Sequence, residues 1–246
     1  ALAQDQRSFE LFGEVRLPIL QDKAFAQTLS AEAGYRYSDY NLGFQTDSYK
    51  LGLDWAPVES LRFRGSYQRA VRSPNIQELF LQQRVQLNGN QDPCAGDTPD
   101  ISAELCARTG VTAAQYGNIL ANPSAQYNGL VGGNVNLDPE ESDTYSYGVV
   151  FTPGFLPNLT VTLDYFDIKV EKLIDSIGQD FIIDQCIISG DPAFCDRINR
   201  IQAPGSVADG SLWLGESGYV EDPILNTGSL QTSGIDLETN YRLGIG

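Results

Sequence analysis

Cysteine spacing is the first feature of this sequence that could do chemistry. The four cysteines fall into two close pairs, Cys94 with Cys106 and Cys186 with Cys195. A structural zinc site would need four convergent thiolates or imidazoles, and the sequence contains no histidine. Two local disulfides are the simpler interpretation, with free thiols as the alternative. Three disulfide connectivities are possible for four cysteines, and the short spacing favours the sequential one. The presence of disulfides indicates an oxidising compartment such as the periplasm or cell surface.

Two pairs of carboxylates could be written as a general acid and a general base. Asp164 and Asp167 are three residues apart, however, and such residues face opposite sides of a regular strand. Asp236 and Glu238 share a face, but alternating carboxylates on a polar sheet face need no catalytic role. Without histidine there is no Ser/His/Asp or Cys/His nucleophile, and no phosphate-binding glycine loop is present. The sequence therefore predicts no catalytic residue and no enzyme.

Calcium is the remaining chemical possibility. Asp92, Asp97 and Asp100 lie close together in a polar segment, and Ca²⁺ prefers clustered oxygen ligands. The ligand spacing of an EF-hand loop is absent, and acidic loops are usually just solvated. We therefore expect no cofactor and no metal site, with calcium at these aspartates as the weaker alternative.

Charge and length restrict the classes of protein. The 246 residues carry a net charge of −16, which argues against nucleic-acid binding because phosphates require clustered Lys and Arg. Nearly all of the excess lies in two segments: residues 73–141 have eight acids and two bases, and residues 171–223 have ten acids and three bases. No apolar run approaches the roughly 18 residues of a membrane-spanning helix. The chain begins at Ala1 without a signal-like segment, so we expect a processed precursor or part of a longer chain.

The elements that must position these side chains are indicated by a repeated alternation of apolar and polar residues, which is typical of half-buried strands. It predicts seven antiparallel strands, around residues 10–17, 29–38, 48–55, 61–68, 144–151, 159–165 and 235–242. Short connections with proline alternate with longer ones; the prolines are Pro18, Pro57, Pro153 and Pro157. In an up-and-down meander, alternate connections lie at the same rim. One rim would therefore carry short turns and the other the two long acidic loops.

Proline and glycine positions give finer expectations. The first strand is expected to end at Pro18, where the first short connection, Pro18–Phe25, begins. Gly228 and Gly234 mark bulges or a bend in the last extended stretch. Residues 182–199 form one or two small helices, with a turn at Asp191.

A transmembrane β-barrel and a soluble β-sandwich both produce such alternation. The predicted strands of roughly 9–12 residues are longer than is usual in soluble sheets. Aromatic rings gather near strand ends, as at membrane interfaces; they are Tyr35, Tyr37, Trp55, Tyr67, Tyr145, Tyr147, Phe151 and Tyr165. Long loops on one rim are typical of outer-membrane barrels. We therefore expect an all-β, transmembrane, antiparallel up-and-down barrel whose charged face, with Arg36, Lys50 and Arg64, looks into a wet lumen.

Six segments, in this order, resemble TonB-dependent outer-membrane receptors, the active importers of Gram-negative bacteria. They are YRYSDYNLGFQTDSYKLGLDWAP, LRFRGSYQRAVRSPNIQELF, LDPEESDTYSYGVVFTP, LTVTLDYFDIKVEKLI, CIISGDPAFCDRINR and TSGIDLETNYRL. The resemblance covers almost the whole chain and implies a barrel of about 22 strands with a plugged lumen. An N-terminal plug domain, the box that engages TonB and the final barrel strands would lie outside this chain, which is then a fragment with about seven strands.

The resemblance also implies where a ligand binds, in a vestibule formed by the plug, the upper lumen wall and the extracellular loops. The matching outer strand ends and loop roots are Arg36, Gln68, Arg72, Asn75 and Glu78, with Asp164 as a weaker candidate. A structural role is the alternative for each of them. The net-negative loops disfavour a highly anionic ligand such as a ferric catecholate.

The first function hypothesis is the barrel segment of an energy-coupled importer for a scarce nutrient such as a metal chelate, carbohydrate or peptide. Its partners would be the outer-membrane bilayer, the small nutrient ligand and the TonB–ExbB–ExbD system acting through the missing plug, with a surface lipoprotein as a further option. The alternatives are a barrel that acts as a passive pore or a surface adhesin and, less favoured, a secreted soluble β-protein or enzyme. A plug and a TonB box upstream would distinguish the importer from these.

Overall fold

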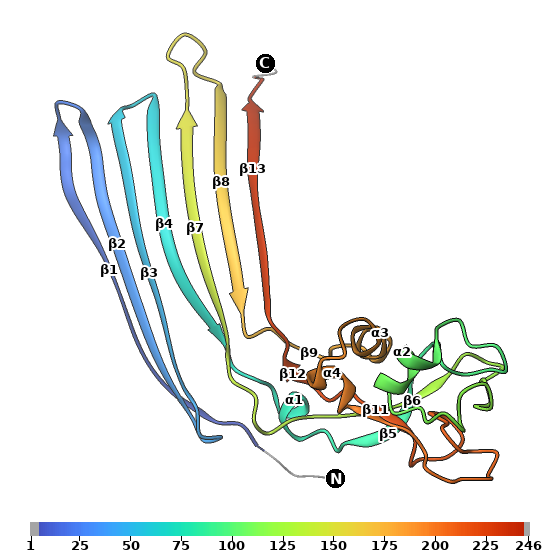
Figure 1. Cartoon of the computed structure of the whole chain (residues 1–246). Helices are drawn as coiled ribbons and strands as arrows, with labels where there is room; N and C mark the ends of the chain where they lie inside the picture. The colour runs from blue at the N-terminus through green and yellow to red at the C-terminus, as the bar shows by residue number, and fades with distance from the viewer. Residues whose placement is uncertain (1–4, 244–246) are drawn as a thin grey trace. The chain divides into compact units, whose positions relative to one another are not determined.

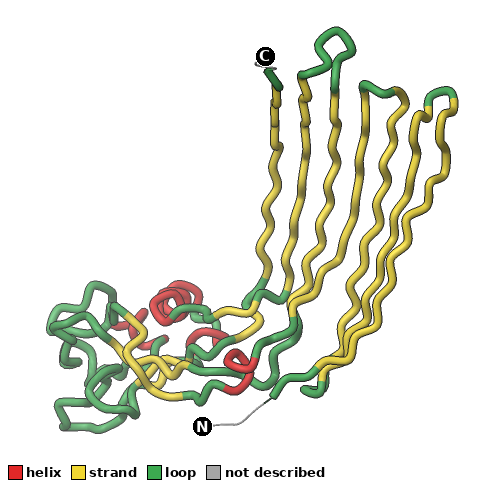
Figure 2. Tube along the Cα trace, turned by 180° about the vertical axis from the view of Figure 1, so that it is seen from behind, coloured by secondary structure: helices red, strands yellow, loops and turns green. Residues whose placement is uncertain are grey.

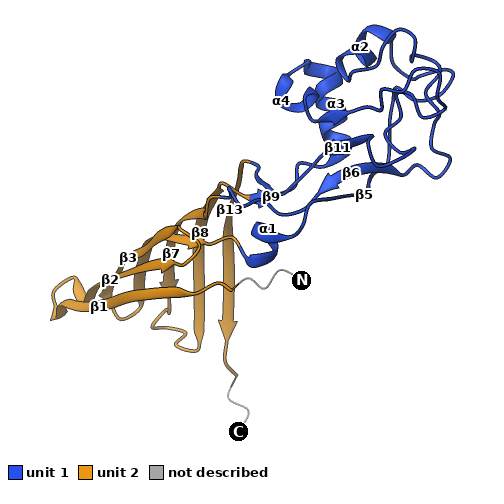
Figure 3. Ribbon diagram, turned by 90° about the horizontal axis from the view of Figure 1, so that it is seen from below, with its two compact units in different colours: residues 1–4, 75–137, 174–227 blue, residues 5–74, 138–173, 228–246 orange. Residues whose placement is uncertain are grey.

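The computed structural model describes residues 5–243, which form two compact units (Figure 3). Residues 5–74, 138–173 and 228–243 make up one, here named the sheet unit, and residues 75–137 and 174–227 make up the other, here named the loop unit. The loop unit is thus built almost entirely from the two polar connections that the sequence predicts at 73–141 and 171–223.

Seven long strands form the sheet unit (Figures 1 and 2). They are β1 (Ser8–Lys23), β2 (Ala26–Tyr40), β3 (Gln45–Val58), β4 (Leu61–Arg72), β7 (Glu140–Phe151), β8 (Leu159–Glu171) and β13 (Ser229–Tyr241). They lie side by side in that order, and every pair is antiparallel, which confirms the predicted meander. β1 and β13 are the two edges, and within the described residues the sheet does not close into a barrel.

Each strand of the sheet unit has a polar and an apolar face, because successive side chains point to opposite sides. The strands run from 12 residues in β4 to 16 in β1, well beyond the length usual in soluble sheets. On the apolar face, Leu53, Leu163 and Leu237 are 51%, 47% and 69% exposed. Soluble proteins rarely expose a contiguous apolar surface of this kind. This face therefore requires an apolar environment outside the chain, as a lipid bilayer provides.

Pro18 lies inside β1, so the predicted end of the first strand at this residue is wrong. Pro18 keeps Ser30 of β2 as its register partner, and the register of β1 against β2 shifts between Pro18 and Leu20. The chain turns after Lys23 instead, with Phe25 at a φ of 59°. Alternation alone does not reveal a strand that continues through a bulge.

The two glycines predicted to mark bulges or a bend differ from each other. Gly228 has a φ of 145° and separates β12 (Leu225–Asn226) from β13, so the chain does break there. Gly234 lies in regular register opposite Phe166 of β8, and the predicted bulge at this residue is wrong. A Cβ on Gly234 would stand 2.8 Å from Phe166 Cζ. This glycine makes room for an aromatic ring.

The loop unit has short elements that the alternation does not reveal. They are α1 (Ile76–Phe80), β5 (Arg84–Gly89), α2 (Ala103–Arg108), β6 (Tyr127–Val131), β9 (Ile174–Asp175), α3 (Gln179–Ser189), α4 (Pro192–Cys195), β10 (Ile198–Asn199) and β11 (Tyr219–Glu221). Four of the strands form a second sheet in the order β10-β11-β6-β5, with β11 parallel to β6. This sheet joins the two long connections into one body. The helices α3 and α4 confirm the pair predicted within 182–199, and Asp191 caps α4.

Two disulfides and an apolar core hold the loop unit together. Cys94 is joined to Cys106 and Cys186 to Cys195, as the spacing predicted. Cys186 belongs to a core around the fully buried Ile182 of α3, and the other disulfide lies in a second, smaller core. Cross-links of this kind typically stabilise a fold by about 2–4 kcal/mol. Within residues 5–243, no helix is long and apolar enough to cross a membrane.

Candidate functional site

The polar face of the sheet unit carries an ion pair that spans three strands. Arg64 of β4, Gly148 of β7 and Asp164 of β8 lie side by side in register. The guanidinium donates across Gly148, from Nε to Asp164 Oδ1 at 3.0 Å and from Nη2 to Oδ2 at 2.6 Å. A Cβ on Gly148 would lie 2.0 Å from Asp164 Oδ1. The absence of a side chain at Gly148 is therefore what lets the two charged groups meet.

Two other glycines of this face are covered in a similar way. Lys50 reaches over Gly34 to Glu14, with 3.4 Å between Nζ and Oε1. The Glu32 side chain lies over Gly52, where a Cβ would come within 2.7 Å of Glu32 Cγ. Long charged side chains thus lie flat along the sheet. The result is a charged face on which much of the charge is neutralised locally.

Arg36 and Gln68, two of the predicted ligand contacts, line one shallow pocket of about 360 Å³ together with Lys50. The Arg36 guanidinium lies 3.9 Å from Glu10 and 5.4 Å from the centre of the Phe12 ring. Its side chain is 53% exposed, so several of its five N–H donors remain open to solvent. Of the predicted site residues, the structure brings these two together at a place where a small polar ligand could touch both.

Arg72 and Asp164, two further predicted contacts, are each held by an opposite charge on a neighbouring strand. Arg72 Nε lies 2.6 Å from Glu140 Oε2 at the rim where β4 ends and β7 begins. Both oxygens of Asp164 accept from Arg64. Because the Glu140 and Asp164 side chains are only 11% and 22% exposed, a ligand would have to compete with a partly buried ion pair. These contacts favour a structural role, and a ligand contact at either residue stays a prediction.

Asn75 and Glu78 form the N-terminal cap of α1 in the loop unit. The Asn75 side chain accepts from the N–H groups of Gln77 and Glu78 at 2.9 Å, and Glu78 Oε2 accepts from the Asn75 N–H at 2.8 Å. This reciprocal arrangement is a capping box, and an N-cap typically contributes about 0.5–2 kcal/mol. Both side chains therefore serve the helix that follows β4. Their predicted contact with a ligand is untested.

Asp92, one of the three calcium candidates, is buried in an ion pair. Arg200 of the second connection donates to both Asp92 oxygens at 2.8 and 2.9 Å, and both side chains are completely buried. The guanidinium also donates to the carbonyl oxygens of Thr109 and Gly210. Among the described residues, no group of three His, Cys, Asp or Glu side chains could hold a metal ion. Asp92 thus links the two long connections to each other.

A second polar contact joins the same two connections. The Ala203 N–H and the Gln115 side-chain amide donate to Asp209 Oδ1 at 2.9 and 2.8 Å. These hydrogen bonds, the one from Ala203 first, hold the pKa of Asp209 below its ordinary value. A carboxylate with a lowered folded-state pKa stabilises the fold above its unfolded pKa of about 3.9, and this contribution is lost as the pH falls through the folded value. The contact is therefore fully effective at neutral pH.

Three residues with central roles were not singled out from the sequence: Arg200, Gly148 and Asp222. Asp222 Oδ1 accepts two backbone hydrogen bonds of 3.0 Å just before α3 and is buried. The alternation does place Gly148 on the polar face, so its register with Arg64 and Asp164 was a usable signal. Arg200 gave none, because its partner lies 108 residues away.

Comparison with known proteins now decides the family. The family described as TonB dependent receptor-like, beta-barrel, matches residues 2–246. The chain belongs to this family. The resemblance seen in the six motifs is thus confirmed. TonB-dependent receptors are outer-membrane proteins of Gram-negative bacteria that serve transport and are not enzymes, which agrees with the predicted location and the predicted lack of catalysis.

Solved structures of similar fold include siderophore receptors and a ferric enterobactin receptor. The siderophore receptor PirA from Acinetobacter baumannii is 15% identical, with 97% of this chain and 26% of that chain covered and a TM-score of 0.57. PirA from Pseudomonas aeruginosa is 15% identical, with 98% of this chain and 32% of that chain covered and a TM-score of 0.56. A mutant of the ferric enterobactin receptor PfeA from the same species is 16% identical, with 94% of this chain and 24% of that chain covered and a TM-score of 0.55. At such identities the likeness concerns the fold alone, and this chain spans about a quarter to a third of their length. No curated protein matches the sequence.

Proposed function

We propose that this chain is part of the barrel wall, with ligand-gathering loops, of an energy-coupled outer-membrane importer whose cargo is an iron chelate. The observation that supports this best is the contrast between the two faces of the sheet unit. One face exposes leucines and aromatic rings to an apolar surrounding, and the other presents flat ion pairs that suit the inner wall of a watery passage. The fold shared with siderophore receptors supports chelated iron as the cargo class.

A wall with locally paired charges suits passage better than a wall of free charges. A charge-assisted hydrogen bond contributes about 1.5–3 kcal/mol, so a free lumen charge would hold a polar ligand and slow its release. Because Arg64 is paired with Asp164 and Lys50 with Glu14, these side chains would make weaker and more easily exchanged contacts with a passing ligand than free charges would. Capture would then fall to the pocket that Arg36 shares with Gln68. The TonB–ExbB–ExbD system, acting on a plug, would supply the energy that releases the ligand from this pocket.

The charge of the loop unit favours one kind of chelate. Residues 75–137 and 174–227 contain 14 acidic residues and four arginines. Such a surface repels anions and attracts cations over a screening length of about 8 Å at physiological salt. We therefore expect a neutral or cationic iron chelate, such as a ferric hydroxamate, to be captured more readily than a highly anionic ferric catecholate.

Uptake of radioactive iron tests the proposed function. The full-length receptor is produced in a Gram-negative host that lacks its own iron-chelate receptors, with and without a functional TonB. We expect ferric hydroxamate uptake that disappears without TonB. Replacing Arg36 and Gln68 together by alanine should raise the half-saturating concentration about tenfold, because two polar contacts are lost. Arg62→Ala is the matched control. Arg62 lies on the same polar face but does not line this pocket, so its replacement should leave uptake unchanged.

The same measurement distinguishes the alternatives. Uptake that persists without TonB would indicate a passive pore. Cells that retain the chelate on their surface without importing it would indicate an adhesin. Either result contradicts the proposal that the protein is an energy-coupled importer.

A further inference from the structure

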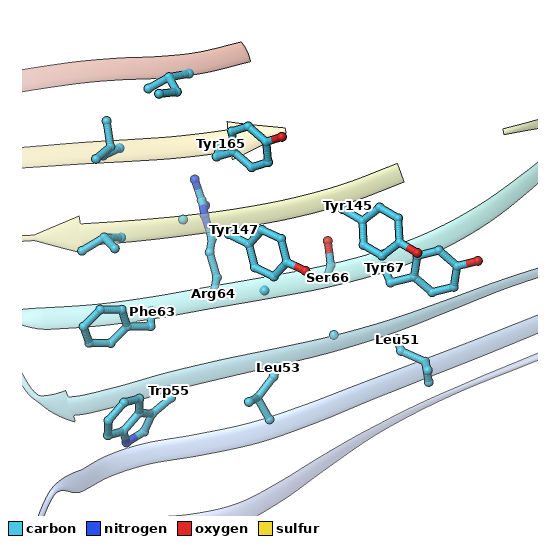
Figure 4. Close-up of a pocket in the computed structure, with 16 residues that line it drawn as sticks. Leu51, Leu53, Trp55, Phe63, Arg64, Ser66, Tyr67, Tyr145, Tyr147 and Tyr165 are labelled. Carbon is cyan, nitrogen blue, oxygen red and sulfur yellow. The ribbon is translucent and has the colours of Figure 1, made fainter. Parts of the chain in front are cut away.

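The second sheet, in the order β10-β11-β6-β5, ends on an open edge at β5 (Figure 1). β5 pairs with β6 on one side, and among the described residues no strand pairs with its other side. The inner strands of the sheet unit differ. β4 lies between β3 and β7 and offers a ligand only side chains, such as those that line the hollow of about 710 Å³ in Figure 4. An edge strand also offers its backbone.

The contacts of β6 show which backbone groups of β5 are open. The Leu130 carbonyl of β6 accepts a hydrogen bond from the second connection, on the side away from β5. The neighbouring Gly129 therefore points toward β5, where its register partner is Gln86. Val85 and Leu87, on either side of Gln86, must then direct their N–H and C=O groups outward. Within residues 5–243 these outward groups have no hydrogen-bond partner.

The side chains of β5 leave this edge open to a further strand. Edge strands are usually protected by charged side chains, by proline or by a covering segment. β5 contains no proline, and the Arg84 side chain is turned along the strand, with Nε 3.1 Å from Gln86 Oε1. Leu87 is 56% exposed, and Val85 on the same face is half-buried. An added strand would therefore find both backbone and apolar side-chain partners.

The open stretch is short. The register of β5 against β6 shifts between Leu87 and Gly89. Beyond this shift the N–H groups of Asn90 and Gln91 already donate to Asp180, at 2.9 and 3.3 Å. An added strand would bond to the two outward residues and end there. A folded protein partner usually needs about 1,200–2,000 Å² of interface, so this edge suits a short peptide better.

Charge selects the kind of peptide. Asp180 and Asp184 of α3 lie next to the end of the open stretch and accept only from the neutral groups of Asn90 and Gln91, with no ion pair in the described part of the chain. The loop unit as a whole has 14 acidic residues and four arginines. Such a surface attracts cations and repels anions.

We infer that β5 binds a short, extended, cationic peptide, which joins the second sheet as an added strand. The peptide backbone bonds to the outward groups of Val85 and Leu87, and a lysine or arginine of the peptide pairs with Asp184. In strand addition, main-chain hydrogen bonds supply affinity and alternate side chains supply specificity. The inference goes beyond the proposed function, because it concerns the loop unit and needs no passage along the sheet unit.

Binding of labelled peptides to the purified full-length receptor, followed by fluorescence anisotropy, tests this site. The probes are a short peptide of alternating lysine and valine, its counterpart of alternating glutamate and valine, and two forms of the lysine peptide. One form is methylated at the backbone nitrogens of every lysine and the other at those of every valine. Only one edge of a strand can face β5, so we expect one methylated form to lose binding and the other to keep it. The glutamate peptide should not bind.

Val85→Pro tests the receptor side of the contact. It removes an outward N–H that β6 does not use, and proline is tolerated on the open side of an edge strand. We expect it to raise the half-saturating concentration of the lysine peptide about tenfold. Ile76→Pro is the matched control in the same unit, because it adds proline at the first position of α1, where proline is favoured. It should leave binding unchanged.

Hydrogen exchange of the β5 amides completes the test. We expect the Val85 and Leu87 amides to exchange rapidly in the free receptor and about tenfold more slowly with the lysine peptide bound. Protection of both amides without peptide would show that another segment of the receptor covers the edge, and would overturn the inference. Equal binding of both methylated forms, or unaltered binding in Val85→Pro, would overturn it as well. Iron uptake is measured separately, so this site and the proposed function fail independently.

Discussion

Replacing Arg200 by methionine is expected to lower the free energy of unfolding of the loop unit by about 3–5 kcal/mol, because a buried carboxylate would lose its partner. The side chains of Arg200 and Asp92 are completely buried and joined by hydrogen bonds of 2.8 and 2.9 Å. Methionine fills a similar space but donates nothing to Asp92 or to the Thr109 carbonyl. Hydrogen exchange of loop-unit amides in the full-length receptor measures the change, since exchange reports local opening free energies.

Two further variants make this result specific. Arg197→Met removes the same side chain from a less buried site, where Nε donates only to the Ala193 carbonyl, and should cost less than about 1 kcal/mol. Combining Asp92→Asn with Arg200→Met removes both charges and keeps an oxygen that can accept the Cys94 N–H, so part of the loss should be recovered. Unchanged exchange in Arg200→Met, or a double variant no better protected than the single one, would contradict the role given to this ion pair.

Replacing Gly148 by alanine is expected to lower the stability of the full-length receptor by about 1–3 kcal/mol. The new Cβ would stand 2.0 Å from Asp164 Oδ1 and 2.7 Å from Arg64 Nε, so their hydrogen bonds cannot persist. The Arg64 side chain is 50% exposed, so water replaces part of what is lost and the effect stays below that of Arg200→Met. The urea midpoint of the receptor in detergent micelles measures the change.

Gly13→Ala is the matched control for this prediction. It makes the same change in β1, where a Cβ would meet nothing within 4 Å, and should cost little or nothing. In a background that already lacks the Arg64 and Asp164 side chains, Gly148→Ala should also become harmless. An equal loss in both backgrounds would show that the glycine matters for another reason.

The sheet unit could be predicted because its pattern is local. Each strand is long enough for period-two alternation to stand out, and β4 alternates from Leu61 to Gln68 without interruption. The same pattern correctly put Arg36 and Gln68 on the polar face. It failed at Pro18, where a bulge shifts the register, because alternation says nothing about how a strand passes an irregular residue.

The loop unit could not be predicted because its contacts are distant in sequence. β6 pairs with β11 through Gly129 and Val220, and strands of three to five residues leave no periodic signal. Asp92 looked like a calcium ligand because composition shows charges but not their partners. The cap at Asn75 was readable, since a polar residue followed three positions later by glutamate is the signature of a capping box.

The assignment of one sheet face to water and the other to lipid underlies the proposed passage. Thr162 and Leu163 are adjacent in β8 and so point to opposite faces, and the described residues contain no free cysteine that would compete for a label. Nitroxide labels in Thr162→Cys and Leu163→Cys, in the full-length receptor in a lipid bilayer, report this directly. We expect the first label to collide mainly with a water-soluble nickel reagent and the second with oxygen dissolved in lipid. Equal access of the nickel reagent to both labels would contradict the assignment.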